Sequence, residues 1–123
     1  RRFENSLIKL KQLGVEIHVR SVFLQGLYFR EINSIPKKLN CLKPVLEKLH
    51  QICKTNNISM SSLALNFVKQ NKNIDKIVIG AESKVQLEDN ITVMNKDIDD
   101  NILELINKLD VVEKELLNPV NWN

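Results

Sequence analysis

A chain of 123 residues with 43% hydrophobic content is long enough for the core of one domain, and its net charge of +3 is small. Its lysines are scattered among acids, which excludes the clustered basic stripe of a nucleic-acid-binding protein, and no run of about 18 apolar residues could cross a bilayer. We therefore expect a cytoplasmic protein without nucleic-acid or membrane partners, in which Cys41 and Cys53 are free thiols.

The first part of the chain predicts a helix followed by a strand. Apolar side chains recur at helical spacing before a capping glycine, Gly14, and are expected to face the core: Phe3, Leu7, Leu10 and Leu13. From Val15 to Val19 apolar and polar residues alternate, which predicts a strand. The alternation ends at Ser21, and Gly26 then allows a turn or the close approach of a ligand.

The middle of the chain predicts a long surface loop and two helices in one layer. Residues 29–42 are irregular and contain the helix breaker Pro36. Pro44 suits the first turn of a helix, whose apolar face is expected to comprise Val45, Leu46, Leu49, Ile52 and Cys53. Ser59 suits the N-cap of the next helix, which ends at a polar break over residues 71–73.

The last part predicts a strand and two helices. Residues 74–79 are rich in β-branched side chains and precede Gly80, which favours a short strand buried on both faces. Helices over residues 84–93 and 99–110 follow. Their inward side chains are expected to be Val85, Leu87 and Ile91 in the first helix, and Ile102, Leu105, Ile106 and Leu109 in the second.

This order of elements is typical of a parallel α/β fold. Two parallel strands alone have open edges, so we expect the chain to be a piece of a larger barrel or sheet. In such barrels the loops after the last two strands commonly hold a phosphate at a helix N-terminus. Residues 21–26, Gly80 and Ala81 follow the two predicted strands, and a helix that begins near Ser83 completes a candidate site.

Three separated motifs stand in order along the chain: RSVFLQGL, SSLALNFV and IDKIVIGAESKVQLEDN. In this order and at this spacing they resemble the C-terminal part of an aldo-keto reductase. The resemblance covers nearly the whole chain. It implies that residues 1–123 are the C-terminal fragment of a single (β/α)8 TIM barrel domain whose N-terminal part is absent. It also implies a parent oxidoreductase that transfers a hydride between a nicotinamide cofactor and an aldehyde, ketone or alcohol.

By this resemblance, cofactor contacts follow the seventh barrel strand. Ser21, Phe23 and Gly26 occupy the Ser, Leu and second Gly positions of the family's S-P-L-x-x-G segment, with Val22 in place of Pro. The family's Ser binds the cofactor. Arg20 stands where many members present a flat aromatic side chain to the nicotinamide, and a planar guanidinium can also stack.

The resemblance implies further contacts after the eighth strand, to the pyrophosphate, ribose and adenine of the cofactor. The matching residues are Gly80, Ala81, Ser83, Gln86, Asp89 and Asn90. Many members carry an Arg at the position of Gln86 to pair with the 2′-phosphate, and an amide offers that phosphate no charge. The resemblance implies NADP as the cofactor, and Gln86 in place of Arg leaves NAD open.

No catalytic residue is assigned, because the family's catalytic Asp, Tyr, Lys and His lie on earlier strands, before Arg1. The isolated 123 residues are therefore expected to show no reductase activity. Tyr28 matches no catalytic motif and is expected to have a packing or loop role. His18 is expected to be a satisfied core or interlayer histidine rather than a base.

The remaining polar and aromatic features have structural interpretations. Asp97, Asp99 and Asp100 stand at a helix start, where capping and the helix dipole account for acids without a metal ion. Trp122 is expected to pin the C-terminal tail rather than to line a substrate mouth. Two functions other than an enzyme stay open: a non-catalytic nucleotide- or phosphate-binding α/β module, and a purely structural subunit.

Overall fold

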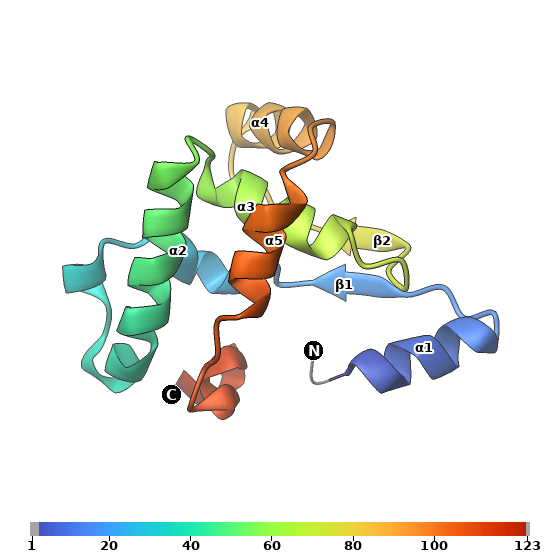
Figure 1. Cartoon of the computed structure of the whole chain (residues 1–123), viewed down its shortest axis with the longest axis horizontal. Coiled ribbons are helices and arrows are strands. Elements are labelled where there is room, and N and C mark those ends of the chain that lie inside the picture. The colour runs from blue at the N-terminus through green and yellow to red at the C-terminus, as the bar shows by residue number, and fades with distance from the viewer. Residues whose placement is uncertain (1–2, 123) are drawn as a thin grey trace.

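The computed structural model describes residues 3–122 as five α-helices, two strands and several short 3-10 turns (Figure 1). The helices are α1 (Glu4–Gln12), α2 (Lys43–Thr55), α3 (Met60–Lys69), α4 (Lys84–Met94) and α5 (Asp100–Asn107), and the strands are β1 (His18–Arg20) and β2 (Lys76–Val78). The predicted order of helices and strands is confirmed. None of the described helices is long and apolar enough to cross a membrane.

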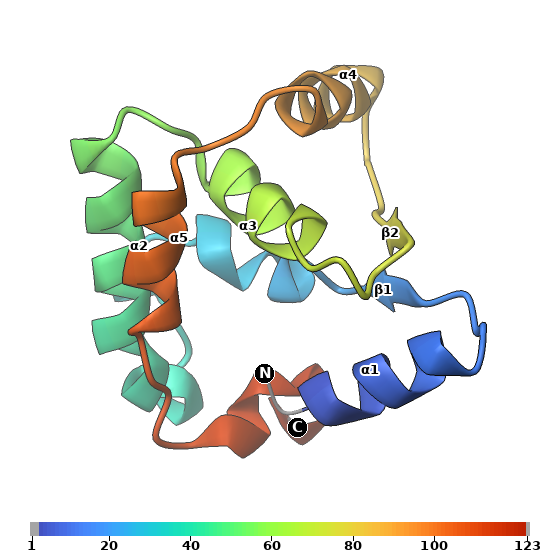
Figure 2. The same cartoon turned by 45° about the vertical axis from the view of Figure 1, so that its right-hand side comes forward.

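The sheet consists of β1 and β2, which pair in parallel with His18 opposite Lys76 and Arg20 opposite Val78. The expectation that the second strand is buried on both faces is wrong, since Val78 is 54% exposed. Figure 2 gives the reason: the two strands lie at one end of the molecule, beside the end of α3 and away from α2 and α5. A sheet with two open edges and little helical cover leaves its apolar side chains in solvent.

The carboxylate of Asp75, just before β2, bonds to α1 and to the residue that precedes β1. The Ile17 N–H donates to Asp75 Oδ2 at 2.7 Å, and Lys11 Nζ donates to Asp75 Oδ1 at 2.6 Å. The carbonyl of Ile17 accepts from the backbone N–H of Asp75 at 2.9 Å. Ile17 is buried, whereas Val15 is exposed, so strand pairing begins later than the alternation predicted.

The bonds of Asp75 with Ile17 and Lys11 make the stability of the fold sensitive to acid. The hydrogen bond from Ile17 N–H, and then Lys11, hold the pKa of Asp75 below its ordinary value of 3.8, with a smaller effect from His18. The folded state therefore binds fewer protons than the unfolded state, and the stabilisation is complete above the ordinary pKa and is lost as pH falls through the lowered one. We expect Asp75→Asn to flatten the dependence of the urea midpoint on pH between about pH 2 and pH 5.

Asp97→Asn is the matched control for this measurement, because Asp97 also pairs with a lysine, Lys69, at 2.7 Å but accepts no hydrogen bond from a backbone N–H within residues 3–122. The acid dependence of its urea midpoint should stay close to that of the unmodified protein. An Asp75→Asn variant with an unchanged acid dependence would contradict the role given to Asp75.

Helix α1 is held by polar contacts, not by its predicted apolar stripe. It has no buried residue, and Phe3 and Leu13 are 64% and 78% exposed. The Asn71 amide donates to the Glu4 carboxylate at 3.2 Å, and Lys11 pairs with Asp75. In both Figure 1 and Figure 2, α1 lies apart from α2, α3 and α5. Ile8, Leu10 and Leu13 are 39 to 78% exposed.

The segment between the sheet and α2 carries much of the core, so the prediction of a surface loop over residues 29–42 is wrong. Ile35, Leu39 and Leu42 are at most 5% exposed and belong to one cluster with Leu46 of α2. Short 3-10 turns over Ile32–Ser34 and Lys37–Leu42 bring them together. The spacing of these four side chains is nearly helical, but Pro36 interrupts it and made the sequence look irregular.

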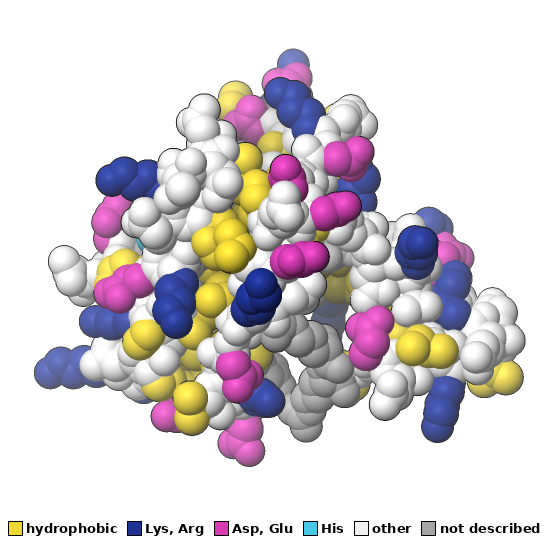
Figure 3. Space-filling view, in the orientation of Figure 1, with side chains coloured by type: hydrophobic (Ala, Val, Ile, Leu, Met, Phe, Trp, Pro, Cys, Tyr) yellow, Lys and Arg dark blue, Asp and Glu magenta, His cyan; other side chains and the backbone are white. Residues whose placement is uncertain are grey.

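Helices α2, α3 and α5 share a second cluster formed by Cys53, Leu63, Ile98, Ile102 and Leu103. The predicted packing of α2 against α3 is therefore confirmed, as is the N-cap, since the Ser62 N–H donates to Ser59 Oγ at 3.0 Å. Figure 3 shows apolar side chains gathered between α2 and α5, while Lys and Arg are interspersed with Asp and Glu on the same face. No basic stripe is visible on the face shown.

Two predicted inward faces are corrected by the structure. In α4 the side chains of Val85, Leu87 and Ile91 are 45 to 65% exposed, because α4 packs mainly on α3 and turns Asn90 toward the interior. In α5 Leu105 is exposed and Leu103 is buried instead. The tail is held as expected: Trp122 Nε1 donates to the Leu116 carbonyl at 2.8 Å, and the indole packs against the first cluster.

Candidate functional site

The two strand ends open into one cavity. Because β1 and β2 are parallel, the segments that follow Arg20 and Val78 leave the sheet at the same edge. A cavity of about 960 Å³ lies there. Nine of the ten residues predicted to bind a cofactor line it: Arg20, Ser21, Phe23, Gly26, Gly80, Ala81, Gln86, Asp89 and Asn90. Their contacts with a cofactor stay a prediction.

Ser83, the tenth predicted residue, serves the helix and is not among the lining residues. Its Oγ accepts from the Gln86 N–H at 3.2 Å, and Gln86 Oε1 accepts from the Glu82 N–H at 2.9 Å. The first bond is an N-cap, and the second resembles that of a capping box, although the Gln86 side chain accepts from the N–H of the residue before the N-cap. The cap sets the direction in which the first turn of α4 faces the cavity.

The backbone after β1 takes an uncommon path along the cavity wall. Ser21, Leu24 and Gln25 have φ values of 63°, 47° and 51°, and Gly26 has 76°. This left-handed region is favourable for glycine and costs other residues about 1–2 kcal/mol each. The buried side chains of Leu24 and Leu27 hold the segment against the core. Strain of this kind persists where the surroundings over-determine the backbone, and it clusters at functional sites.

The cavity contains lining residues that sequence reasoning missed. Phe29 meets Phe23 edge to face with ring centroids 5.3 Å apart, and half of its side chain is exposed. Glu82 and Ser61 also line the cavity. Ser61 comes from α3, which lies between the strands in sequence, so only the tertiary structure brings it to the strand ends.

The polar groups of the cavity include an unused amide. Asn90 is 7% exposed, and its side chain has no hydrogen-bond partner in the part of the chain that the structure describes. Its amide atoms keep access to solvent, because Asn66 Oδ1 is the fully buried side-chain polar atom without a partner in the described chain. Asn90 therefore fits a site that binds a polar ligand.

His18 and Tyr28, the two residues weighed above for a catalytic role, lie outside this cavity. His18 is exposed and its Nε2 lies 2.9 Å from Glu16 Oε1, so the expectation of a core or interlayer histidine is wrong. Strand β1 has solvent on that side, where a histidine pairs with a neighbouring acid. The pKa of Glu16 is lowered mainly by its hydrogen bond with Lys76. Tyr28 packs against the first cluster, and burial raises the pKa of its phenol, which agrees with a packing role.

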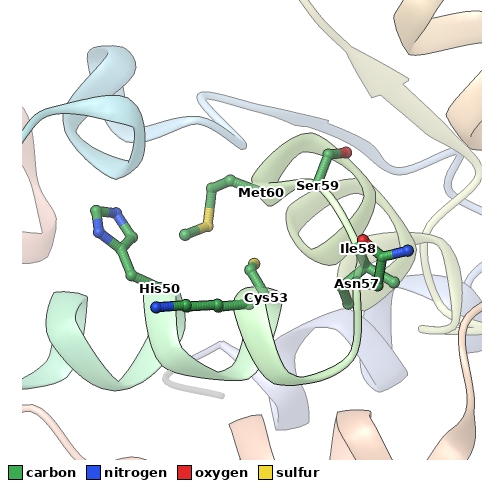
Figure 4. Close-up of a pocket in the computed structure, with 7 residues that line it drawn as sticks. His50, Cys53, Asn57, Ile58, Ser59 and Met60 are labelled. Carbon is green, nitrogen blue, oxygen red and sulfur yellow. The ribbon is translucent and has the colours of Figure 1, made fainter.

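A second cavity, of about 550 Å³, lies between the end of α2 and the start of α3 (Figure 4). His50, Cys53 and Met60 point into the same space. His50 Nε2 donates to the Tyr28 carbonyl at 2.8 Å, and burial raises the pKa of the Cys53 thiol. A protonated, buried thiol is a poor nucleophile, so this cavity is a weaker candidate site.

The acids before α5 act as caps and ion-pair partners. The Asn101 N–H donates to Asp99 Oδ1 at 2.8 Å, which confirms the capping interpretation of Asp99. Asp97 pairs with Lys69. Within residues 3–122 no group of three or more His, Cys, Asp or Glu side chains could hold a metal ion.

Comparison with known proteins agrees with the resemblance in the three motifs. The model of the Aldo/keto reductase family matches residues 1–111, which include both strands, α4 and α5. No curated protein and no solved structure matches the chain. Because the family match spans most of the 123 residues and contains the whole cavity, the chain belongs to the aldo/keto reductase family.

Proposed function

We propose that this chain supplies the nicotinamide-dinucleotide cradle of an NAD(P)H-dependent oxidoreductase. The parent enzyme would transfer a hydride between the cofactor and an aldehyde, ketone or alcohol. Family membership supports this, since aldo-keto reductases generally use NAD(P)H and act on small carbonyl substrates. The observation that carries the proposal is that two segments about 60 residues apart, after β1 and after β2, line one cavity with the residues that the motifs select.

The donors around the cavity suit an anionic, polar cofactor. The first N–H groups of α4 have no partner within a helix, and the helix dipole favours negative charge there, so a pyrophosphate fits this end. A Cβ built on Gly80 would meet nothing within 4 Å, which leaves room for close approach. Arg20 and Asn90 add a cation and a free amide.

The role of these residues is to bind and orient. When bound, the nicotinamide supplies or accepts the hydride. Arg20 would face its ring, and the segment over residues 21–26 would hold the cofactor from the β1 side. Misplacement of the nicotinamide by about 1 Å can cost on the order of 100-fold in rate. The anchoring of residues 21–26 by the buried Leu24 and Leu27 would therefore help to position the cofactor.

The two-stranded sheet also has a place in this proposal. A parallel pair with open edges and exposed apolar side chains is what one part of a (β/α)8 barrel would contribute to the whole domain. We therefore propose that further strands, which carry the proton-transfer residues, pair with β1 and β2. The chain by itself is expected to lack reductase activity.

Cofactor binding is the first test, by isothermal titration of NADH and NADPH into the purified protein that contains this chain. Ala81→Trp should weaken the binding of both cofactors about tenfold or more, because the indole would occupy the cavity and Ala81 is exposed enough to accept it. Glu47→Trp, on the exposed side of α2, is the matched control and should leave the affinities unchanged.

The outcome separates the candidate functions. Binding that Ala81→Trp weakens, together with NAD(P)H oxidation by a carbonyl compound, supports the oxidoreductase. Binding without turnover of any carbonyl compound would favour the non-catalytic nucleotide-binding module. Equal affinities in the two tryptophan variants would place the cofactor elsewhere and overturn the proposed cradle.

A further inference from the structure

We propose that His50 of α2 is a positioning residue of the candidate site. Its hydrogen bond to the Tyr28 carbonyl orients the wall that Phe23 and Phe29 form along the cavity. The inference rests on the proposed function and adds to it a residue that lies outside both the cavity and the three motifs. The observations that carry it are the bond from His50, the rigid peptide unit that receives this bond and the contact between the two phenyl rings.

The segment after β1 is held against the core by contacts that have no preferred direction. Leu24 and Leu27 are buried in the first cluster, and the hydrophobic effect that favours their burial is not directional. The hydrogen bonds within the segment are local: the Gly26 N–H donates to the Phe23 carbonyl at 2.9 Å, and the Arg30 N–H donates to the Leu27 carbonyl at 3.2 Å. These bonds shape the turns but do not orient the segment relative to the rest of the fold. Its orientation needs a directional contact from another element.

His50 supplies such a contact. The half-buried side chain extends from α2 (Figure 4), and its Nε2 donates to the carbonyl of Tyr28, 22 residues earlier in the chain, at 2.8 Å. A carbonyl oxygen only accepts hydrogen bonds, so this contact keeps a proton on Nε2 of His50. Hydrogen bonds favour N–H···O angles above about 150°, so the bond constrains the direction of the Tyr28 carbonyl as well as its position.

The peptide unit between Tyr28 and Phe29 transmits this constraint to the cavity. Its six atoms lie in one plane, so the direction of the Tyr28 carbonyl also sets the place of the Phe29 N and Cα. The side chain of Phe29 starts from that Cα, lines the cavity and meets Phe23 edge to face, with ring centroids 5.3 Å apart. Aromatic pairs prefer particular relative orientations of their rings. His50 therefore helps to orient both rings although it does not line this cavity.

Loss of the bond from His50 is expected to weaken cofactor binding although it removes no group that lines the cavity. Without it, the segment would sample orientations in which Phe29 has moved away from Phe23. The affinity then falls in proportion to the fraction of molecules that keep the binding orientation. The net contribution of a typical single hydrogen bond corresponds to about a fivefold change in an equilibrium constant.

The test compares two amide side chains at position 50. His50→Gln keeps an N–H donor near the place of Nε2, whereas the shorter side chain of His50→Asn ends near the place of Nδ1 and does not reach the Tyr28 carbonyl. Isothermal titration of NADH and NADPH into the purified protein that contains this chain measures the effect. We expect binding about fivefold weaker in His50→Asn, and within about twofold of the unmodified protein in His50→Gln.

Lys48→Gln and Lys48→Asn are the matched controls. Lys48 is exposed on the same helix, where asparagine is also a poorer helix former than glutamine. The two Lys48 variants therefore report the effect of helix propensity alone, and their cofactor affinities should not differ.

Two further measurements separate positioning from a general loss of stability. In the cofactor-free protein, the Arg30 amide, which bonds to the Leu27 carbonyl, should exchange with solvent faster in His50→Asn, and His50→Gln should keep its protection. In a Phe29→Ala background, His50→Asn should cause no further loss of cofactor affinity, because the wall through which His50 acts is already removed.

Each outcome has a separate meaning. Weaker binding in His50→Asn, retained binding in His50→Gln and coupling to Phe29→Ala would together establish the role of His50. Equal affinities in the two His50 variants, or losses that add fully to that of Phe29→Ala, would overturn it and leave the proposed cradle standing. Failure of both cofactors to bind the unmodified protein would overturn the cradle, and with it the role of His50 in binding.

Discussion

Replacement of Leu27 by alanine is expected to lower the free energy of unfolding by about 3 kcal/mol. Leu27 is 1% exposed and packs in the cluster that contains Leu24, Leu39 and Leu46. Truncation removes the apolar contacts of a fully buried side chain and leaves a cavity, which closes only in part because these neighbours come from three different segments. The urea midpoint of the purified protein measures the effect.

Leu27→Ala should also act on the candidate site. Leu24 and Leu27 hold the segment in which Ser21 and Gly26 line the cavity, and four of its residues have left-handed backbone. Loss of the anchor lets this strained segment relax, so cofactor affinity should fall together with stability. Leu117→Ala is the control: Leu117 is 43% exposed, and its truncation should cost less than about 1 kcal/mol. Equal losses in the two variants would contradict this account of the core.

Asn66 is the position at which a single charge should be most costly. Its side chain is fully buried in α3, and its Nδ2 donates to the Ser62 carbonyl at 3.0 Å. Its Oδ1 has no hydrogen-bond partner among the residues that the structure describes. In Asn66→Asp a carboxylate would replace the amide in a fully buried position, where its neighbour in the described chain is the neutral Ser62 hydroxyl, 3.5 Å from Asn66 Nδ2, and not a cation. We expect a loss of about 3 kcal/mol or more at neutral pH.

The pH dependence of Asn66→Asp identifies the cause of this loss. Burial disfavours the charged form and raises the pKa of the new carboxyl in the folded state above its unfolded value of about 4. The folded state then binds more protons than the unfolded state, so the loss is small below about pH 4 and grows as pH rises toward the raised pKa. A loss that is the same at pH 4 and pH 7 would point to shape and not to charge.

Asn66→Leu is the counterpart of this variant. Leucine has a similar volume and removes the unpaired Oδ1, while the Ser62 carbonyl keeps its place in the hydrogen bonds of α3. Replacement of an imperfectly paired buried polar group by an apolar one is often neutral or stabilising. We expect the urea midpoint of Asn66→Leu to be unchanged or to rise by the equivalent of about 1 kcal/mol. A clear loss would show that the contacts of the Asn66 amide with Ser62 stabilise the fold by more than this.

Helix starts could be predicted best from the sequence where a side chain caps the first turn. Ser59, Ser83 and Asp99 each accept a hydrogen bond from a backbone N–H in the first turn of their helix, as side chains of this kind do at an N-cap. The site was also predictable in large part, because parallel strands bring their carboxyl ends to one edge and so bring residues after β1 close to residues after β2.

Burial was predicted less well, because it depends on which neighbour covers each face. Val85 and Ile91 recur at a spacing compatible with a helix face, yet α4 meets α3 with a different side and leaves them in solvent. Ile35 and Leu39 stand in a segment with a proline that resembles a loop, yet they belong to one core cluster with Leu24 and Leu27. Periodicity identifies a helix but does not say which of its sides meets a partner.

The sequence by itself determined the order of the elements, the caps of the helices and the family, because these depend on residue types at short and regular spacings. Only the tertiary structure decided which side chains face the cavity together. Glu82, Phe29 and Ser61 line it without a local signal, and the Gln86 amide, which also lines it, is bonded to the Glu82 N–H. The charge of a binding site is a sum over residues that are distant in sequence, so its selectivity is decided where the chain folds them together.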